Sequence, residues 1–287
     1  MKGIVLAGGS GTRLFPLTYS ISKQILPVYD KPLIFYPISV LMLAGIKDIA
    51  IVSSPRDIKL FENLLGDGTN YGVNFTYLIQ ENPKGIADGI LVAKDFISDQ
   101  NCCLILGDNI FFGYQFTDML RDAKENLDGA TIFSTFVNNP SDFGVVELDK
   151  DGHIISIDEK PSNPRSNLAI TGLYFYNNSV VDIVKSIKPS ARGELEITDV
   201  NKIYFEQNLL KVLQLGRGFA WLDTGTNDSM QTAGDFVSTI QKRQGLQIAC
   251  LEEIAFKNGW IDKEILSNQI KKYINSDYGR YLQKLIV

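Results

Sequence analysis

The stretch Leu6-Ala7-Gly8-Gly9-Ser10-Gly11-Thr12-Arg13-Leu14 follows a short apolar run, Gly3–Leu6, that is typical of a buried strand. Its three glycines fall within four positions, so the backbone can bring several N–H groups close to one anion. Arg13 adds a planar cation with several donors. A strand followed by such a loop predicts an α/β fold with a phosphate site at its start. The alternative is a glycine-rich turn that binds nothing.

The spacing within this loop differs from that of the two common phosphate loops. A Walker A loop needs GxxxxGK followed by Ser or Thr, whereas Gly11 is followed by Thr12 and Arg13. A dinucleotide fingerprint that began at Gly9 would need a third glycine where Leu14 stands. The loop therefore predicts a phosphate site of another kind, and a nicotinamide dehydrogenase is rejected.

The first 129 residues alternate short β-branched runs with helical patterns, which indicates a mostly parallel sheet flanked by helices. The predicted strands are Gly3–Leu6, Asp48–Ser53, Asn74–Gln80 and Cys103–Leu106, and the predicted helices are Leu33–Ala44, Arg56–Leu65, Ile86–Phe96 and Phe116–Asn126.

From Ala130 the pattern changes to strands separated by turn clusters, followed by a helical C-terminus. The predicted strands are Thr131–Val137, Val145–Leu148, Ile154–Asp158, Leu173–Tyr176 and Leu209–Leu215, and the predicted helices are Ser179–Ser186, Ile197–Gln207, Ser229–Gln244, Leu251–Asn258 and Lys263–Ile274. No internal repeat or low-complexity linker marks a domain boundary, so we expect a single domain over residues 1–287.

Composition excludes several classes of protein. The 28 Lys and Arg against 33 Asp and Glu give a net charge of −5, which argues against a general nucleic-acid binder. The N-terminus lacks a signal-peptide core, so we expect a cytoplasmic protein. The longest apolar stretch, Leu33–Gly45, is shorter than the roughly 20 residues of a membrane span. With three cysteines and one histidine, zinc sites and histidine-activated nucleophiles are nearly excluded.

Two acids stand at predicted strand ends, where open α/β sheets bind ligands. Asp108 follows Leu104–Leu106, and Asp223 lies in Trp221-Leu222-Asp223-Thr224-Gly225. Two carboxylates beside a phosphate loop are suited to Mg²⁺, which prefers oxygen ligands. The alternative for Asp108 is that it caps the next helix. Lys23 is either a phosphate contact or a solvated loop charge, and Glu159-Lys160-Pro161 is either a hydroxyl acceptor beside a cation or a plain charged strand end.

These motifs together resemble the sugar-1-phosphate nucleotidylyltransferases over essentially the whole chain. The signature stretch is Ala7–Thr18, and the later motifs follow in the family's order: Ser22–Val28, Leu106–Asn109, Asp142–Val145, Asp158–Pro161, Ile170–Tyr174, Glu194–Asp199, Trp221–Gly225 and Leu251–Phe256. The resemblance implies a Rossmann-like nucleotidyltransferase fold with a mixed, mostly parallel sheet. It further implies a nucleotide-binding part at 1–129, a sugar-phosphate-binding part at 130–228, and a helical C-terminal part at 229–287 that forms an oligomer interface.

Within this family the chain resembles members that use dTTP and glucose 1-phosphate with Mg²⁺, and that resemblance implies a role for each matching residue. Arg13, Lys23, Asp108 and Asp223 would be catalytic, with Asp108 and Asp223 as the metal ligands. The remaining residues implied to bind the two substrates are Leu6, Gly8, Gly9, Ser10, Gly11, Thr12, Gln80, Gly85, Asn109, Gly144, Glu159, Lys160, Ile170, Tyr174 and Arg192. Among these, Gln80 and Gly85 would read the pyrimidine edge, and Lys160 with Arg192 would hold the sugar phosphate.

The chain departs from the family pattern near the base and sugar pockets. Asp88 stands where the family usually has Gln, and Phe143 stands where Tyr is more common. These changes put the base and sugar preference in question and leave the phosphate machinery intact. Uridylyl-, cytidylyl- and adenylyltransferases and a non-catalytic nucleotide-sugar sensor therefore stay open. The resemblance also implies a homotetramer, a dimer of dimers, with an inhibitory nucleotide or nucleotide-sugar site at a subunit interface near the C-terminal helices.

Overall fold

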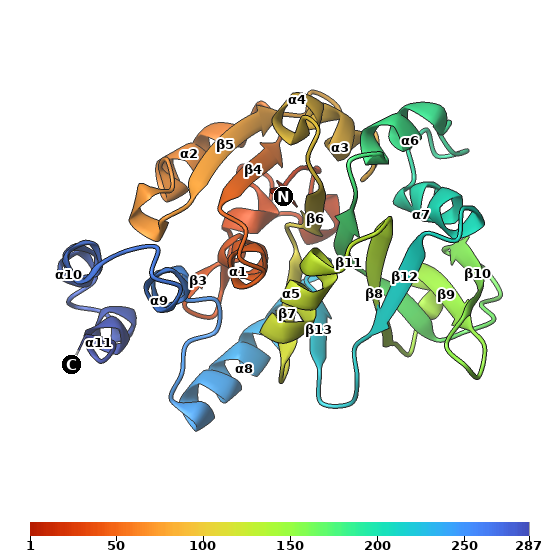
Figure 1. Ribbon diagram of the computed structural model, residues 1–287. Coiled ribbons are helices and arrows are strands. Elements are labelled where there is room, and N and C mark those ends of the chain that lie inside the picture. Colours follow the sequence, from red (N-terminus) through yellow and green to blue (C-terminus); the bar gives the residue numbers. More distant parts are fainter. Residues whose placement is uncertain (287) are drawn as a thin grey trace.

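The computed structural model describes residues 1–286, which are built around one nine-stranded sheet (Figure 1). Its parallel half consists of β1 (Lys2–Leu6), β4 (Asp48–Ser53), β5 (Asn74–Ile79) and β6 (Cys102–Leu106). Strand β1 lies between β4 and β6, so the loop after β1 opens at the middle of the carboxyl edge. The expected α/β fold is confirmed.

The second half of the sheet is organised by one long strand, β11 (Leu168–Tyr176), whose residues are all buried. Strand β8 (Ala130–Phe136) pairs with one edge of β11 and with β12 (Leu210–Gln214). The other edge of β11 is shared between β6, along 173–176, and β9 (Gly144–Leu148), at Ala169. Strand β10 (Ile154–Glu159) completes the sheet beside β9.

Helices cover both faces of the sheet, as the alternation of side chains requires. On β1, Ile4 joins the core with α3 (Asp88–Val92), α4 (Lys94–Ile97), α6 (Val180–Ser186) and α7 (Ile197–Glu206). Its neighbour Val5 joins the opposite core with α1 (Phe35–Leu43), α2 (Ile58–Leu65), α5 (Phe116–Glu125) and the C-terminal helices α9 (Leu251–Lys257), α10 (Lys263–Lys272) and α11 (Asp277–Gln283).

Two small antiparallel ribbons lie outside the main sheet. One pairs β2 (Pro27–Val28) with β3 (Lys31–Pro32). The other pairs β7 (Asn109–Phe112) with β13 (Ala220–Asp223), and in it Asp223 lies opposite Asn109. The helix α8 (Asn227–Gln244) follows β13 and begins with a capping box at Thr226 and Ser229.

Several predicted elements differ from the structure. The single helix expected over 86–96 is wrong, because the structure has two short helices, α3 and α4, that are divided at Ala93. The Ala87 N–H donates to the Leu195 carbonyl, and α3 begins only after it, at Asp88. The strand at 173–176 begins earlier, at Leu168. The elements β7, β13 and α11 were not predicted. Because β7 follows Asp108 directly, the alternative that Asp108 caps a helix is also wrong.

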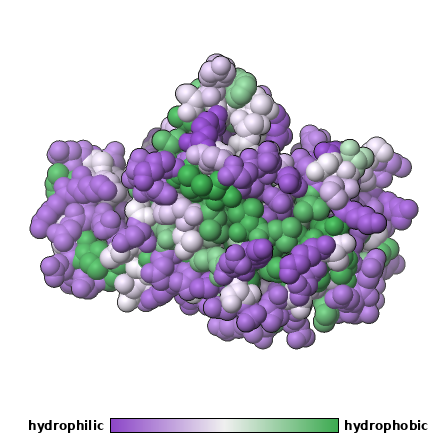
Figure 2. Space-filling model, turned by 90° about the horizontal axis from the view of Figure 1, so that it is seen from above, coloured by the Kyte–Doolittle hydropathy of each residue, from purple (hydrophilic) through white to green (hydrophobic). Residues whose placement is uncertain are grey.

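On the face of the molecule that Figure 2 shows, most of the side chains are polar. Seen from above, apolar side chains gather in a band across the middle of the face, with polar side chains around it (Figure 2). Within residues 1–286 no helix is long and apolar enough to cross a bilayer.

Candidate active site

In the loop after β1, the backbone N–H groups of residues 8–11 have no hydrogen-bond acceptor among the described residues. Gly9 and Gly11 have φ values of +102° and +61°, a region that glycine adopts without strain. The Thr18 hydroxyl donates to the Gly11 carbonyl at 2.7 Å and fixes the end of the loop. In the described part of the chain, no carbonyl or side chain accepts a hydrogen bond from the N–H groups of residues 8–11. These donors are available to an anion such as a phosphate.

Asp108 lies at the centre of a polar cluster at the carboxyl end of β6. Its carboxylate pairs with the Lys23 ammonium through Oδ2 and accepts from the Asn109 amide through Oδ1, at 2.8 Å. Its carbonyl accepts from the Thr224 hydroxyl at 2.8 Å. Residues 108 and 223 are thereby brought together, although 115 positions separate them in the sequence.

Asp223 is the second acid of this cluster. Its burial and the negative charge of Asp108 raise the pKa of Asp223 from 3.8 to about 6, against the opposing charges of Lys23, Arg13 and Lys160. A Cβ built on Gly225 would lie 3.2 Å from both the Arg13 guanidinium and the Asp223 carboxylate, so both groups reach the same point. Two half-buried acids that repel each other beside cations fit a site for a divalent cation, which would relieve that repulsion.

Two adjoining cavities meet at this cluster. The first, of about 370 Å³, is lined by the loop after β1 together with Lys23, Gln80, Gly85 and Asp108. The second, of about 940 Å³, is lined by Asn109, Gly144, Glu159, Lys160, Ile170, Tyr174 and Asp223, among others. Arg13, Ile86, Leu106 and Asp108 line both. The expected nucleotide residues therefore gather in one cavity and the expected sugar residues in the other.

Arg192 is the exception among the expected residues, because it lines neither cavity. Its guanidinium donates to Glu159 at 3.1 Å and to Glu196 at 3.0 Å. The second oxygen of Glu159 accepts from the Thr198 hydroxyl at 2.5 Å. Arg192 thus orients the Glu159 carboxylate from outside the cavity. Its contact with a sugar phosphate stays a prediction.

Two residues of the second cavity were missed by sequence reasoning. The Trp221 indole donates to Asn109 Oδ1 at 2.7 Å, and the same oxygen accepts from the Gly172 N–H at 3.0 Å. These bonds fix the Asn109 amide so that its nitrogen faces Asp108. The second residue is Thr198, whose hydroxyl orients Glu159. Both residues lie in motifs that resemble the family's, which was the available signal.

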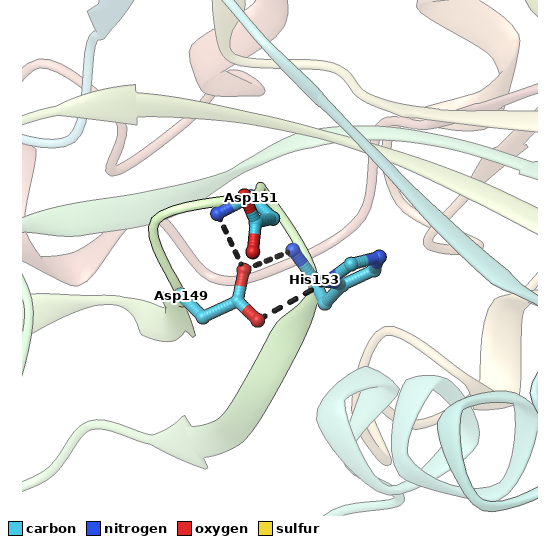
Figure 3. A group of neighbouring side chains, drawn as sticks. All are labelled: Asp149, Asp151 and His153. Atoms are coloured by element: carbon cyan, nitrogen blue, oxygen red, sulfur yellow. Dashed lines mark hydrogen bonds and ion pairs between the residues drawn. The ribbon is translucent and has the colours of Figure 1, made fainter.

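One group of possible metal ligands lies outside this site. Asp149, Asp151 and His153 are exposed and close together in the turn between β9 and β10 (Figure 3). The Asp149 carboxylate accepts from the N–H groups of Asp151 and His153 at 2.9 and 2.8 Å, and it pairs with the His153 ring at 3.1 Å. These contacts close the turn and account for the cluster without an ion.

A third cavity, of about 690 Å³, lies between the β7–α5 connection and α9. It contains none of the residues expected to bind the two substrates. Its rim includes Tyr114, which is 87% exposed.

Residues 2–239 match the family model described as nucleotidyl transferase. It is 53% identical to the glucose-1-phosphate thymidylyltransferase of Neisseria meningitidis, with 100% of this chain and 99% of that protein aligned. It is 49% identical to the Mycobacterium tuberculosis protein of the same name, with 100% and 99% aligned.

Solved structures show the same architecture. A Bacillus anthracis protein assigned as a glucose-1-phosphate thymidylyltransferase and solved with sucrose superimposes with a TM-score of 0.77 and 38% identity, over 82% of this chain and 94% of that one. A UDP-glucose pyrophosphorylase in complex with UDP-glucose has a TM-score of 0.73 and 26% identity, over 83% and 98%.

Proposed function

This chain belongs to the nucleotidyl transferase family, and on that basis we propose that it transfers the thymidylyl group of dTTP to glucose 1-phosphate, giving dTDP-glucose and pyrophosphate. The observation that carries the proposal is that the nucleotide and sugar cavities adjoin at Arg13 and Asp108. Two anionic reactants can meet only where positive charge and oriented donors offset their repulsion. The free amides of the loop, with Arg13 and Lys23, provide both.

The reaction needs alignment and charge neutralisation more than proton transfer. The phosphate oxygen of glucose 1-phosphate is already a nucleophile at neutral pH, so it attacks the α-phosphorus of dTTP in line and pyrophosphate leaves. No general base is required, which fits a chain with a single, exposed histidine. In this proposal the loop amides and Arg13 hold the triphosphate and the departing pyrophosphate, and Lys23 neutralises the reacting phosphates.

We propose Mg²⁺ as the divalent cation, held by Asp108 and Asp223. Magnesium would supply positive charge between the phosphate groups of the two substrates. Lys23 already pairs with Asp108, and burial holds Asp223 partly protonated near pH 6. The chain's own groups therefore limit the repulsion between the two acids before any substrate binds.

The sugar side of the proposal rests on the second cavity. Glu159, held by Thr198 and Arg192, accepts hydrogen bonds from glucose hydroxyls, and Asn109, Gly144, Ile170 and Tyr174 line the pocket. The exposed Lys160 contacts the sugar phosphate.

On the base side, Gln80 and Gly85 bind the edge of the pyrimidine, and one methyl group distinguishes thymine from uracil. Such a contact is worth only about 1–3 kcal/mol, so we expect UTP to be used slowly.

We also propose that the protein assembles as a homotetramer, a dimer of dimers, with an inhibitory nucleotide site near the C-terminal helices. Two observations support a site there. The third cavity borders α9, and half-exposed aromatic side chains, Phe256 and Trp260, lie on and beside that helix.

A panel of nucleotides and sugars tests the proposed activity. Pyrophosphate release is measured for dTTP, UTP, CTP, ATP and GTP against several sugar 1-phosphates. We expect the highest kcat/KM for dTTP with glucose 1-phosphate. A clear preference for another pair would replace the substrates while leaving the family unchanged.

Two variants test the metal ligands. Asp108→Asn and Asp223→Asn each remove a carboxylate that would hold the cation. We expect at least a hundredfold loss of Mg²⁺-dependent turnover, with an unchanged far-UV circular dichroism spectrum. Near-normal turnover in both variants would refute the metal assignment.

A further inference from the structure

Asp88 contacts Gln80, the residue proposed to bind the base, from the side away from the cavity. Gln80 follows β5 directly, is 6% exposed and lines the nucleotide cavity. Its side-chain nitrogen donates to Asp88 Oδ2 at 2.7 Å. Asp88 opens α3 and is half-buried, and it does not line the cavity itself. Asp88 therefore has no contact of its own with a ligand in this cavity, and its hydrogen bond to Gln80 is the contact through which it can act there.

The chemistry of this contact fixes which way the Gln80 amide points. A carboxylate only accepts hydrogen bonds, whereas an amide has one face that donates and one that accepts. Gln80 must therefore turn its NH₂ group toward Asp88 and its carbonyl oxygen away. The reverse orientation would place two acceptor oxygens against each other and would lose a charge-assisted hydrogen bond. A glutamine at position 88 would accept either orientation.

The fixed amide presents its carbonyl to the loop side of the cavity. A Cβ built on Gly8 would lie 3.0 Å from Gln80 Oε1, which places this oxygen beside the phosphate loop. Across residues 1–286 no donor reaches Oε1, so the oxygen is available to a ligand. The Gly85 N–H, in the same cavity, also has no acceptor within those residues. The cavity thus offers one fixed acceptor and one free donor.

We propose that Asp88 is a positioning residue that selects the nucleobase by locking the Gln80 amide. Thymine and uracil carry a ring N–H at N3 beside carbonyl oxygens, which complements the Gln80 oxygen and the Gly85 N–H. Cytosine carries a lone pair at N3, which meets the locked carbonyl oxygen and is repelled. The inference deepens the proposed function, on which it rests, by assigning the exclusion of cytosine to a residue that does not touch the base.

Asp88→Asn tests this role because an asparagine can donate or accept and so releases the Gln80 amide to turn. The values of kcat/KM for dTTP and dCTP are measured by pyrophosphate release with glucose 1-phosphate, and dCTP is also measured as a competitor of dTTP. We expect the preference for dTTP over dCTP to fall at least tenfold. The change should lie mainly in KM and Ki, with kcat for dTTP within about threefold of the unsubstituted protein.

Two further variants separate positioning from loss of charge or of structure. Asp95→Asn removes an exposed carboxylate from the neighbouring helix α4 and should leave the preference unchanged. The double variant Gln80→Glu with Asp88→Asn exchanges acceptor and donor between the two side chains. One oxygen of the carboxylate introduced at position 80 accepts from the amide introduced at position 88, and the other oxygen faces the base as an acceptor. We expect this exchange to restore the dTTP preference to within about threefold, even if overall turnover falls.

The outcomes distinguish this inference from the proposed function. An unchanged preference in folded Asp88→Asn would overturn the role of Asp88, and so would failure of the double variant to restore it. If the unsubstituted protein does not join dTTP to glucose 1-phosphate, the proposed function fails. In that case calorimetric binding of dTTP and dCTP without sugar still tests the locking of Gln80 in the same variants.

Discussion

The ionised side chain of Asp223, which is proposed to hold the cation, destabilises the folded state when no cation is bound. Burial and the charge of Asp108 raise its pKa to about 6, while the unfolded chain ionises near 3.8. Between these values the folded state binds more protons, so the free energy of unfolding falls as pH rises through that window. Above pH 6 the ionised carboxylate costs on the order of 2–3 kcal/mol.

We therefore expect Asp223→Asn to stabilise the protein while it loses activity. In metal-free buffer at pH 7.5 the variant should unfold several degrees higher. The gain should shrink at pH 5, where the aspartic acid is largely protonated in the folded state. Thermal unfolding at both pH values measures this, with the exposed Asp235→Asn as a control for loss of charge. An equal change at both pH values would contradict the assigned pKa.

At this scale the sequence predicted which charged groups gather in one place, and their roles stay predictions. It did not predict several of the contacts that the structure shows among the side chains around them. Arg13, Lys23, Asp108 and Asp223 converge because each lies at the end of a strand or in a loop at the same sheet edge. The pairing of Arg192 with Glu159 joins residues 33 positions apart, and the bond from Trp221 to Asn109 spans 112. Such contacts depend on side-chain orientations that no local pattern encodes.

Among the elements, the ribbon of β7 and β13 matters most for the site and was not predicted. Each strand has four residues, and the partners are more than 100 positions apart. Alternation over four residues is too short to separate a strand from a loop. The ribbon nevertheless aligns Asp223 with Asn109, next to Asp108. The parallel strands β1, β4, β5 and β6 were predicted within one residue at each end. The apolar runs of β1, β4 and β6 are buried on both faces, which makes them easy to recognise, whereas β5 is only partly buried.

The segment between β5 and α3 yields a prediction about glycine. Gly85 has a φ of +105°, and a Cβ there would lie 2.4 Å from the Leu195 carbonyl oxygen. Backbone hydrogen bonds from Leu195 to Lys84 and from Ala87 to Leu195 hold the segment in that position. Gly85→Ala must therefore displace the base pocket. We expect a loss of about 1–3 kcal/mol in the free energy of unfolding and a several-fold higher KM for dTTP.

A matched glycine separates steric contact from backbone strain. Gly152, in the β9–β10 turn, has a φ of +87°, and a Cβ added there would meet no atom within 4 Å. Gly152→Ala should cost about 1 kcal/mol and leave the KM for dTTP unchanged. Urea unfolding and steady-state kinetics on both variants measure the difference. Equal effects of the two substitutions on KM would show that the contact with Leu195 is unimportant.

For the whole molecule, the alternation of short β-branched runs with helical patterns along the chain was enough to predict the fold class, because it is the signature of βαβ units around a mostly parallel sheet. The extent of the core was less predictable. The apolar cluster on the α1 face includes Val5 and Leu282, so the first strand and the last helix share one core. The C-terminal part was expected to form an oligomer interface, and that stays a prediction. Its helices also pack into the core of the same chain.

This shared core predicts that the C-terminal helices cannot be removed. Deleting residues 246–287 would take away Leu251, Ile261, Leu266, Ile270 and Leu282, all buried against the α1 face. At about 1.5–3 kcal/mol for each side chain, the loss is on the order of 10 kcal/mol. That equals the whole free energy of unfolding of a typical domain. We expect the shortened chain to lack a cooperative thermal transition, whereas the full chain shows one. A shortened protein that unfolds sharply and still releases pyrophosphate would show that these helices serve assembly alone.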